Sequence, residues 1–281
     1  MVKEFNYFGD FFGSFKDAFR KPVVFLPFAA ILLLTLIFNI SLNFIGLEAA
    51  ITEAGVDTAT LTYLVIVFVI LMLITWYLYA SGIYGAKILV TGKKLSAENI
   101  FGGGAKIYFR YVGMSVLRGI IYLIPLTPVI IVLYHAVQPV FSGVSDQADG
   151  GLALLGLALL LVYILLAIVL YILFLFSEVL ISLKNSGPWR ALRDSFLFLK
   201  NNFGHVLMTF LVIFLLWLSI IAITVTISVV FALLTIMSPG LESLFDIINN
   251  FLTGVISMIT QPVLLIYLFK SFKSKKPELL R

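Results

Sequence analysis

The amino-acid sequence predicts an all-α, polytopic integral membrane protein with six transmembrane helices arranged as three hairpins and both termini in the cytoplasm. Hydrophobic residues make up 62% of the 281 residues and charged residues 12%, against about 45–50% and about 25% in soluble domains. The mean hydropathy is +1.13. All 19 Lys and Arg residues fall in four clusters. These clusters alternate with loops in which every charged residue is an Asp or Glu. A soluble class is therefore excluded, and the chain is treated as one membrane domain.

Residues 1–21 predict an amphipathic helix at the membrane surface. Its apolar side chains recur at steps of three and four, which places them on one helix face, while the charged side chains fall on other faces. The stretch also lacks the short basic region and apolar run of a cleaved signal, so we expect the first span to be retained. The apolar stripe consists of Phe5, Phe8, Phe12, Phe15 and Phe19.

Residues 22–90 form the first predicted hairpin, because a span needs about 20 apolar residues. The spans are expected at 22–44 and 61–90. Between them lies a polar turn that contains Glu48, Glu53 and Asp57.

Residues 91–183 contain a second surface segment and the second hairpin. The segment at 96–111 could form another surface helix, but Gly102-Gly103-Gly104 should weaken it. A flexible linker or close helix packing explains these glycines better than a phosphate cradle, since no Walker pattern is present. Spans are expected at 112–137, interrupted by Pro125 and Pro128, and at 151–183.

Residues 184–270 contain a third surface helix and the third hairpin, with a basic tail at 271–281. The helix again shows steps of three and four. Spans are expected at 205–237 and 251–269. The apolar runs at 151–183 and 205–237 cover about 50 Å as helix, so they should tilt or project beyond the ~30 Å hydrocarbon core. The apolar stripe of the helix consists of Trp189, Leu192, Phe196, Leu199 and Phe203.

A shift of 184 positions aligns the first and third surface helices. Both apolar stripes superimpose under this shift, Asp10 falls on Asp194, and Lys16 falls on Lys200. An internal repeat explains this match. The general similarity of surface helices also explains it, and the sequence leaves both open.

The cations set the expected orientation. Loops that alternate with the four basic clusters hold seven acids and no Lys or Arg, so the positive-inside rule places both termini and both long connections in the cytoplasm. We therefore expect a multi-pass protein of the cell membrane. The acids are Glu48, Glu53, Asp57, Asp146, Asp149, Glu242 and Asp246.

The stretch from Glu178 to Gly204 resembles a known family. An acid near the end of a span, a turn at 185–187, the run Ala191-Leu192-Arg193-Asp194-Ser195 and then Asn202-Phe203-Gly204 are similar to the six-helix membrane domains fused to some glycerophosphodiester phosphodiesterases, and to related stand-alone prokaryotic membrane proteins of unknown function. The resemblance implies an accessory, envelope-related membrane module. The chain has no room for the phosphodiesterase barrel, so that activity is not implied.

Arg118 and Glu178 are two formal charges within the predicted spans. Each lies six or seven residues from the cytoplasmic end of its span. If the two spans are antiparallel neighbours, both side chains lie at the same depth in the membrane. We predict that they form an ion pair. The pair could be a proton or anion site, and it could equally be a structural clasp or a pair that snorkels to the interface.

Proline and aromatic residues within the spans predict a possible cavity. Carbonyls freed by proline can line a substrate route, and a tyrosine hydroxyl at mid-depth needs a partner. Simple helix kinks and ordinary packing are the alternatives. The candidate residues are Trp76, Tyr77, Tyr79, Pro125, Thr127, Pro128, Gln261 and Pro262.

Basic residues outside the spans are expected to contact anionic lipid headgroups on the cytoplasmic side. They could also form a docking surface for a protein partner. Nucleic acid is not expected as a partner, because the positions of the Lys and Arg residues are already explained by the orientation of the spans in the membrane. The candidates are Lys16, Arg20, Lys21, Arg190, Arg193, Lys200, Lys270, Lys273, Lys275 and Lys276.

The sequence therefore favours a non-enzymatic membrane protein that acts as an accessory or scaffold component of the cell envelope. Cysteine is absent, and no metal, cofactor or nucleophile motif is present. The alternative is a transporter or permease of a small solute or lipid. A polar cavity at mid-depth would favour transport, and tight apolar packing would favour the scaffold.

Overall fold

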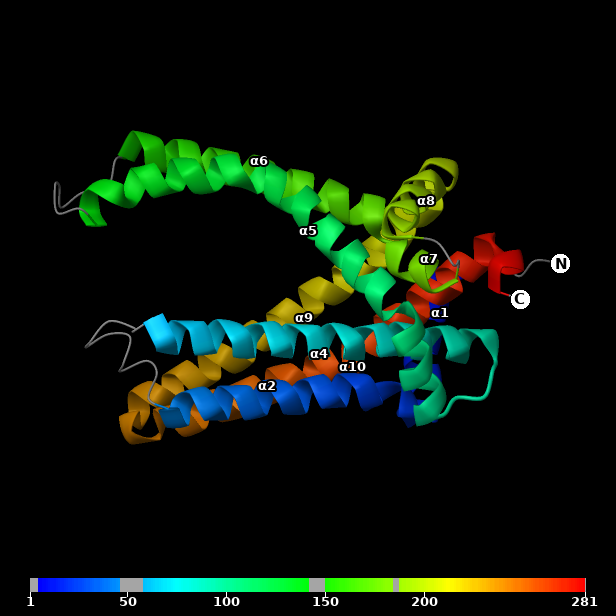
Figure 1. Cartoon of the computed structure of the whole chain (residues 1–281), viewed down its shortest axis with the longest axis horizontal. Coiled ribbons are helices and arrows are strands. Elements are labelled where there is room, and N and C mark those ends of the chain that lie inside the picture. Colours follow the sequence, from blue (N-terminus) through cyan, green and yellow to red (C-terminus); the bar gives the residue numbers. More distant parts are fainter. Residues whose placement is uncertain (1–4, 46–57, 142–149, 184–186, 281) are drawn as a thin grey trace. The chain divides into compact units, whose positions relative to one another are not determined.

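The computed structural model describes residues 5–45, 58–141, 150–183 and 187–280 (Figure 1). These residues form helices and contain no strand. Six of the helices are long and apolar enough to cross a membrane, which confirms the all-α prediction with six candidate spans. The loop acids Glu48, Glu53, Asp57, Asp146 and Asp149, and the 184–186 part of the turn, lie outside the described residues.

The chain divides into two compact units, which are described separately. Unit 1 comprises residues 1–109, 182–184 and 208–281, and unit 2 comprises residues 110–181 and 185–207. Three of the described helices contribute to both units: α5 (Ala97–Phe141), α7 (Ser177–Leu183) and α9 (Phe203–Met237).

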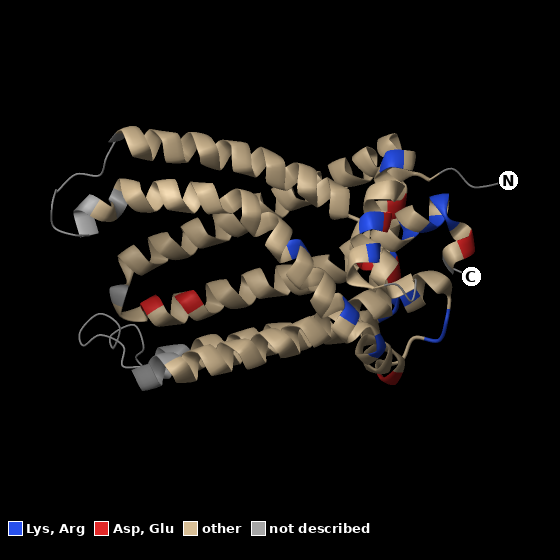
Figure 2. Ribbon diagram, turned by 45° about the horizontal axis from the view of Figure 1, so that its top comes forward, with Lys and Arg blue, Asp and Glu red and all other residues tan. Residues whose placement is uncertain are grey.

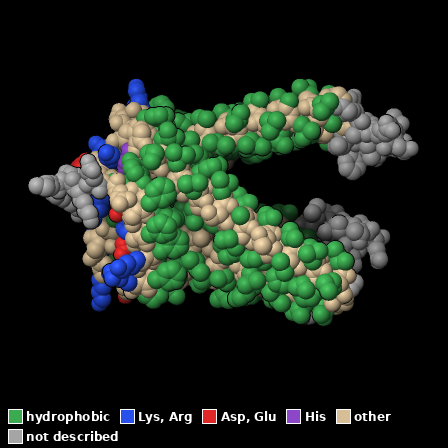
Figure 3. All heavy atoms as spheres, turned by 180° about the vertical axis from the view of Figure 1, so that it is seen from behind, with side chains coloured by type: hydrophobic (Ala, Val, Ile, Leu, Met, Phe, Trp, Pro, Cys, Tyr) green, Lys and Arg blue, Asp and Glu red, His purple; other side chains and the backbone are tan. Residues whose placement is uncertain are grey.

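Unit 1 is built around α10 (Glu242–Lys275), which packs against α2 (Leu26–Ile45), α4 (Thr58–Thr91) and α1 (Tyr7–Arg20) (Figure 1). Residues 262–269 of α10 are all buried. Short 3₁₀ turns, η1 (Pro22–Phe25), η2 (Pro239–Leu241) and η3 (Pro277–Leu280), flank these helices. Hydrophobic side chains cover the outer surfaces of the long helices (Figure 3), as expected for surfaces that meet lipid.

The first surface helix is present as α1, and its start is capped. The Asn6 side chain accepts a hydrogen bond from the Gly9 amide at 2.9 Å, and the Asn6 amide donates to Asp10 at 3.0 Å, which satisfies amides that a helix start leaves unpaired. The side that packs into the protein carries Phe11, Ser14 and Ala18. The predicted stripe is therefore not the packing face. Three of its members point outward: Phe8, Phe12 and Phe19.

Residues 97–141 form one helix of 45 residues, α5, so the predicted separation into a weak surface segment and a span is wrong. A Cβ at Gly104 would lie 2.7 Å from the Ser81 Cα, and one at Gly103 would overlap the Tyr84 ring. These glycines let α5 approach α4 closely, and this packing outweighs their low helix propensity. Close helix packing is therefore the correct alternative for this stretch.

The prolines within the spans do not break their helices. The helix α5 is continuous through Pro125 and Pro128, and α10 is continuous through Pro262. The predicted interruption of these spans is therefore wrong. Each proline still removes one backbone donor, because it has no N–H.

Unit 2 contains the remainder of α5 with α6 (Gly150–Phe174), α7 (Ser177–Leu183) and α8 (Pro188–Asn201). The predicted span at 151–183 is broken between α6 and α7, where residues 175–176 form a turn. Ser195 of α8 stabilises this turn: its hydroxyl donates to the Leu173 carbonyl at 2.8 Å and accepts from the Phe176 amide at 3.3 Å. Backbone groups that the break would leave unpaired are thereby satisfied.

The apolar stripe of α8 is divided between two environments. Leu192 and Leu199 are buried in the protein, whereas Trp189, Phe196 and Phe203 are exposed. Like α1, α8 has 14 residues and presents part of its apolar surface outward. This shared property agrees with the alignment of the two helices at a shift of 184 residues.

Charge is distributed unevenly along unit 1 (Figure 2). Glu242 and Asp246 lie in the first turns of α10, and Lys270, Lys273 and Lys275 lie in its last turns. The basic end contacts α1 and α4, because Lys270 pairs with Asp17 at 2.7 Å and Lys273 donates to the Val90 carbonyl at 3.0 Å.

Candidate functional site

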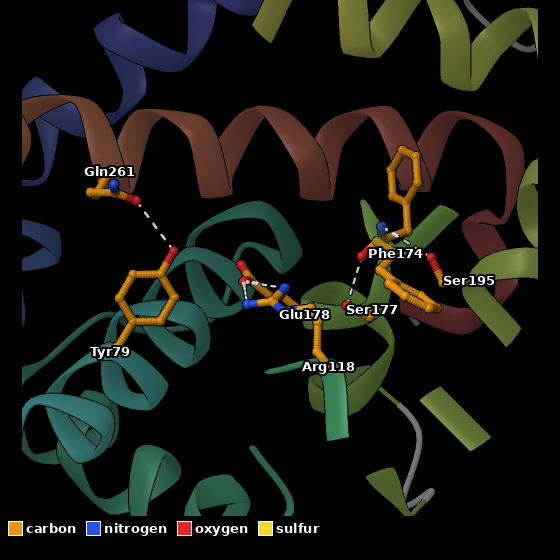
Figure 4. A network of polar contacts seen from close by, with 8 residues as sticks. Tyr79, Arg118, Phe174, Ser177, Glu178, Ser195 and Gln261 are labelled. Carbon is orange, nitrogen blue, oxygen red and sulfur yellow. Dashed lines mark hydrogen bonds and ion pairs between the residues drawn. The ribbon is translucent and has the colours of Figure 1, made fainter. Parts of the chain in front are cut away.

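Arg118 and Glu178 form an ion pair within unit 2 (Figure 4). Both terminal guanidinium nitrogens of Arg118 lie 3.2 Å from Oε1 of Glu178. Glu178 lies in the first turn of α7, directly after the break that follows α6. The turn thus positions the carboxylate, and the pair joins α5 to α7.

The two side chains keep only 28% (Arg118) and 13% (Glu178) of their surfaces exposed. In so sheltered a place each charge compensates the other, and removing one partner would leave the other charge without compensation. The geometry therefore suits a clasp between two helices. An incoming anion would have to displace Glu178 from Arg118.

A cavity of about 400 Å³ lies in unit 1 among α2, α4 and α10. On α2 it extends from Phe28 to Asn39, and on α10 from Asn250 to Gln261. Each stretch covers about 17 Å of helix, so the cavity occupies the middle of the candidate spans. No charged side chain lines it.

Hydrogen-bonding groups line this cavity. Tyr79 donates to Oε1 of Gln261 at 3.2 Å (Figure 4). Pro262 cannot supply the amide that would bond the Met258 carbonyl, and Met258 also lines the cavity. The other polar side chains of the lining come from all three helices: Thr35, Asn39, Thr75, Asn250, Thr253 and Ser257.

Among the described residues, three of these polar side chains show no hydrogen bond to another residue. Asn39 and Thr75 are half-buried, and Asn250 is exposed. An unpaired amide or hydroxyl inside a membrane is costly. A bound molecule or water that supplies the missing hydrogen bonds would remove that cost.

The cavity contains two of the eight predicted cavity residues, Tyr79 and Gln261. Pro262 is buried directly after Gln261, and Trp76 is half-buried on α4 outside the lining. The Tyr77 hydroxyl instead donates to the Phe101 carbonyl at 3.1 Å.

The other three predicted cavity residues, Pro125, Thr127 and Pro128, belong to unit 2 and do not line this cavity. The Thr127 hydroxyl bonds to the Leu123 carbonyl of its own helix at 2.9 Å. Their assignment to one cavity with Gln261 is not supported.

The sequence contained a signal for the missed lining residues. Asn250, Thr253, Ser257 and Gln261 recur at steps of three and four along α10, which puts them on one helix face. Thr35 and Asn39 show the same step on α2. Polar groups that share one face of an apolar helix predict the lining of this cavity more directly than prolines do.

The predicted headgroup cations are mostly solvent-exposed. Exposed members are Lys16, Arg20, Lys21, Arg190, Arg193, Lys200, Lys273, Lys275 and Lys276. Lys270 is half-buried and pairs with Asp17. The ammonium group of Lys273 is already bonded to the Val90 carbonyl, so these two lysines also hold the ends of helices together.

Comparisons of the chain with known protein families, with curated proteins and with solved structures find no match.

Proposed function

We propose that this protein binds and transports a small uncharged solute, or the polar part of a lipid, through the cavity among α2, α4 and α10. The observation that supports this most directly is a cavity of about 400 Å³ lined by polar side chains, of which Asn39, Thr75 and Asn250 have no hydrogen bond to another described residue. A scaffold that needed only tight packing would gain stability from apolar residues at these positions.

The lining chemistry indicates the class of ligand. Amides and hydroxyls can donate and accept hydrogen bonds, but the lining has no side chain that could neutralise a charge. A net charge carried into this cavity would therefore be disfavoured. A molecule with hydroxyl or carbonyl groups fits the lining.

The proposed orientation places the basic end of unit 1 in the cytoplasm. In this proposal the chain forms three hairpins of the cell membrane with both termini inside, because the Lys and Arg clusters follow the positive-inside rule. Because the sequence contains no cysteine, a single introduced cysteine is the only thiol that can be labelled, and the side of the membrane on which it lies can be tested. A single cysteine replacing Lys276 should react with an impermeant maleimide only in inverted vesicles, and one replacing Glu242 only in right-side-out cells.

The ligand can be sought by native mass spectrometry of the protein extracted gently from its own membrane. We expect one small molecule or lipid bound to each chain, and we expect Ser257→Trp, which fills the cavity, to lose it. Ser219→Trp is the matched control, because Ser219 is an exposed serine on α9 outside the lining. Equal occupancy in both variants would contradict the proposal.

An accessory or scaffold role is the second candidate. It is favoured by the outward aromatic side chains of α1 and α8, such as Phe12 and Trp189, which suit insertion into a membrane surface or contact with a partner. The family resemblance of residues 178–204 points the same way. In the same experiment, a stoichiometric second polypeptide with no small ligand would favour this role.

A further inference from the structure

A second cavity in unit 1 lies at the junction of α4 and α5 and is basic. Its volume is about 400 Å³. Three lysines, Lys93, Lys94 and Lys106, line it together with one acid, Glu98. All four residues are exposed, so the cavity is open to solvent and carries an excess of positive charge.

The turn that carries Lys93 and Lys94 is fixed by backbone hydrogen bonds. Gly92 adopts φ 73°, the Gly92 amide bonds to the Leu89 carbonyl at 3.3 Å, and the Lys93 amide bonds to the Ile88 carbonyl at 3.2 Å. This is the Schellman pattern that ends helices with a left-handed glycine. The two lysines therefore leave α4 in a defined direction.

A second set of contacts fixes the other side of the turn. The Asn99 side chain donates to the Lys94 carbonyl at 3.1 Å, and the Asn99 amide bonds to the Ser96 hydroxyl at 3.3 Å. The first turn of α5 is thus tied to the lysine-bearing loop. The cavity is part of an ordered junction between two long helices.

Gly102 of α5 is one of the residues that line the basic cavity. Packing explains the next two glycines, since a Cβ at Gly103 or Gly104 would collide with α4. Nothing lies within 4 Å of a Cβ at Gly102. The space beside Gly102 is therefore open, and a larger side chain at this position would project into the cavity.

We propose that this cavity binds the phosphate of an anionic membrane lipid, with Lys93, Lys94 and Lys106 around the headgroup. Lysine ammonium groups bind phosphate as point charges. A lipid is favoured over a soluble phosphate compound because Phe109, 83% exposed, follows Lys106 by three residues and lies on the same side of α5. An exposed aromatic ring beside a cationic cavity suits an acyl chain below a phosphate.

The cavity also lies at the end of unit 1 where anionic headgroups are expected. Lys273 of α10 donates to the carbonyl of Val90, two residues before Gly92, so the basic end of α10 meets the end of α4. In the proposed orientation this end faces the cytoplasmic leaflet, where a negative surface potential attracts lysine clusters. The site is independent of the uncharged cavity among α2, α4 and α10.

The test is native mass spectrometry of the purified protein titrated with phosphatidylglycerol, with phosphatidylcholine and with inorganic phosphate. We expect one saturable phosphatidylglycerol per chain and weaker binding of the zwitterionic lipid. Replacing Lys93, Lys94 and Lys106 with Gln should reduce the affinity on the order of a hundredfold, since each surface lysine contributes roughly a factor of five to an anionic lipid surface.

Two further variants distinguish binding at this cavity from a general attraction of anionic lipid to the basic surface of the protein. Gly102→Leu fills the cavity, changes no charge and favours the helix, so it should abolish the one-to-one binding in a folded protein. A control with Lys21, Lys275 and Lys276 changed to Gln removes the same charge from exposed lysines outside the cavity and should retain it.

Native-like binding by Gly102→Leu, or equal loss in both triple variants, would overturn the proposed site. Displacement of the lipid by inorganic phosphate at millimolar concentration would overturn the assignment to a lipid and indicate a soluble phosphate ligand.

Discussion

Removing one member of the Arg118–Glu178 pair should cost far more stability than removing both. Both guanidinium nitrogens lie 3.2 Å from one carboxylate oxygen, and Glu178 is the more sheltered partner, with 13% of its side chain exposed. Removing one partner of a buried pair costs about 3–5 kcal/mol, because a charge is left unpaired. Arg118→Met leaves the Glu178 carboxylate behind, and its 13% exposure lets water screen only a small part of this cost, so we expect about 3 kcal/mol.

The double variant Arg118→Met, Glu178→Leu leaves no charge behind. Apolar residues of similar volume often replace a buried pair at little cost, so its free energy of unfolding should lie within about 1 kcal/mol of the native value. The two single losses should therefore exceed the double loss by about 3 kcal/mol or more.

Reversible unfolding in mixed detergent micelles, followed by tryptophan fluorescence and circular dichroism, measures all three variants against the native protein. The control cycle combines Glu178→Leu with Lys200→Met, because Lys200 is an exposed cation on α8 and should act additively. If the Arg118–Glu178 double variant loses the sum of the single losses within about 0.5 kcal/mol, the ion pair does not exist in solution.

Three other substitutions test the packing. Gly104→Ala should destabilise the protein by about 1–3 kcal/mol, because its Cβ would lie 2.7 Å from the Ser81 Cα; thermal unfolding measures this. Ser195→Ala should cost about 1–3 kcal/mol, because it leaves backbone groups of the α6–α7 turn unsatisfied; hydrogen exchange at the Phe176 amide should also accelerate. Asp17→Asn should cost under about 1 kcal/mol, since its partner Lys270 keeps solvent contact, and the loss should shrink in high salt.

Matched variants separate these effects from general perturbation. Gly119→Ala on the same α5 helix meets no neighbour within 4 Å and should be neutral or stabilising. Ser219→Ala removes a hydroxyl that bonds only within its own helix, to Leu215, and should have little effect. Equal losses in test and control variants would show that the described contacts contribute nothing specific.

The spans were predictable because length and apolar composition alone define them. The contact between Arg118 and Glu178 also follows from the sequence, since two charges at one depth of an apolar bundle have few other partners. The face of α1 that packs against the protein was harder to predict from the sequence. Its Phe stripe gives the strongest pattern, but docking uses Phe11, Ser14 and Ala18, where small side chains allow α10 to come close.

Tertiary packing explains the remaining errors. The glycines of α5 look like helix breakers until Ser81 and Tyr84 of α4 are placed beside them. The turn after Phe174 follows neither a glycine nor a proline, and the hydroxyls of Ser195 and Ser177 provide hydrogen bonds to its backbone groups. The uncharged cavity forms where particular faces of three helices meet. The amino-acid sequence alone does not specify which helix faces pack together.

The docking of α1, α2 and α4 on α10 has a consequence for biosynthesis. About 150 residues separate the end of α4 from the start of α10, and a ribosome needs roughly 8–30 s to add them. During that interval α1 has no docking surface, and the polar faces of α2 and α4 lack the third wall of their cavity. We therefore expect unit 1 to complete its assembly only after α10 has been inserted, with the earlier helices relying on the insertion machinery until then.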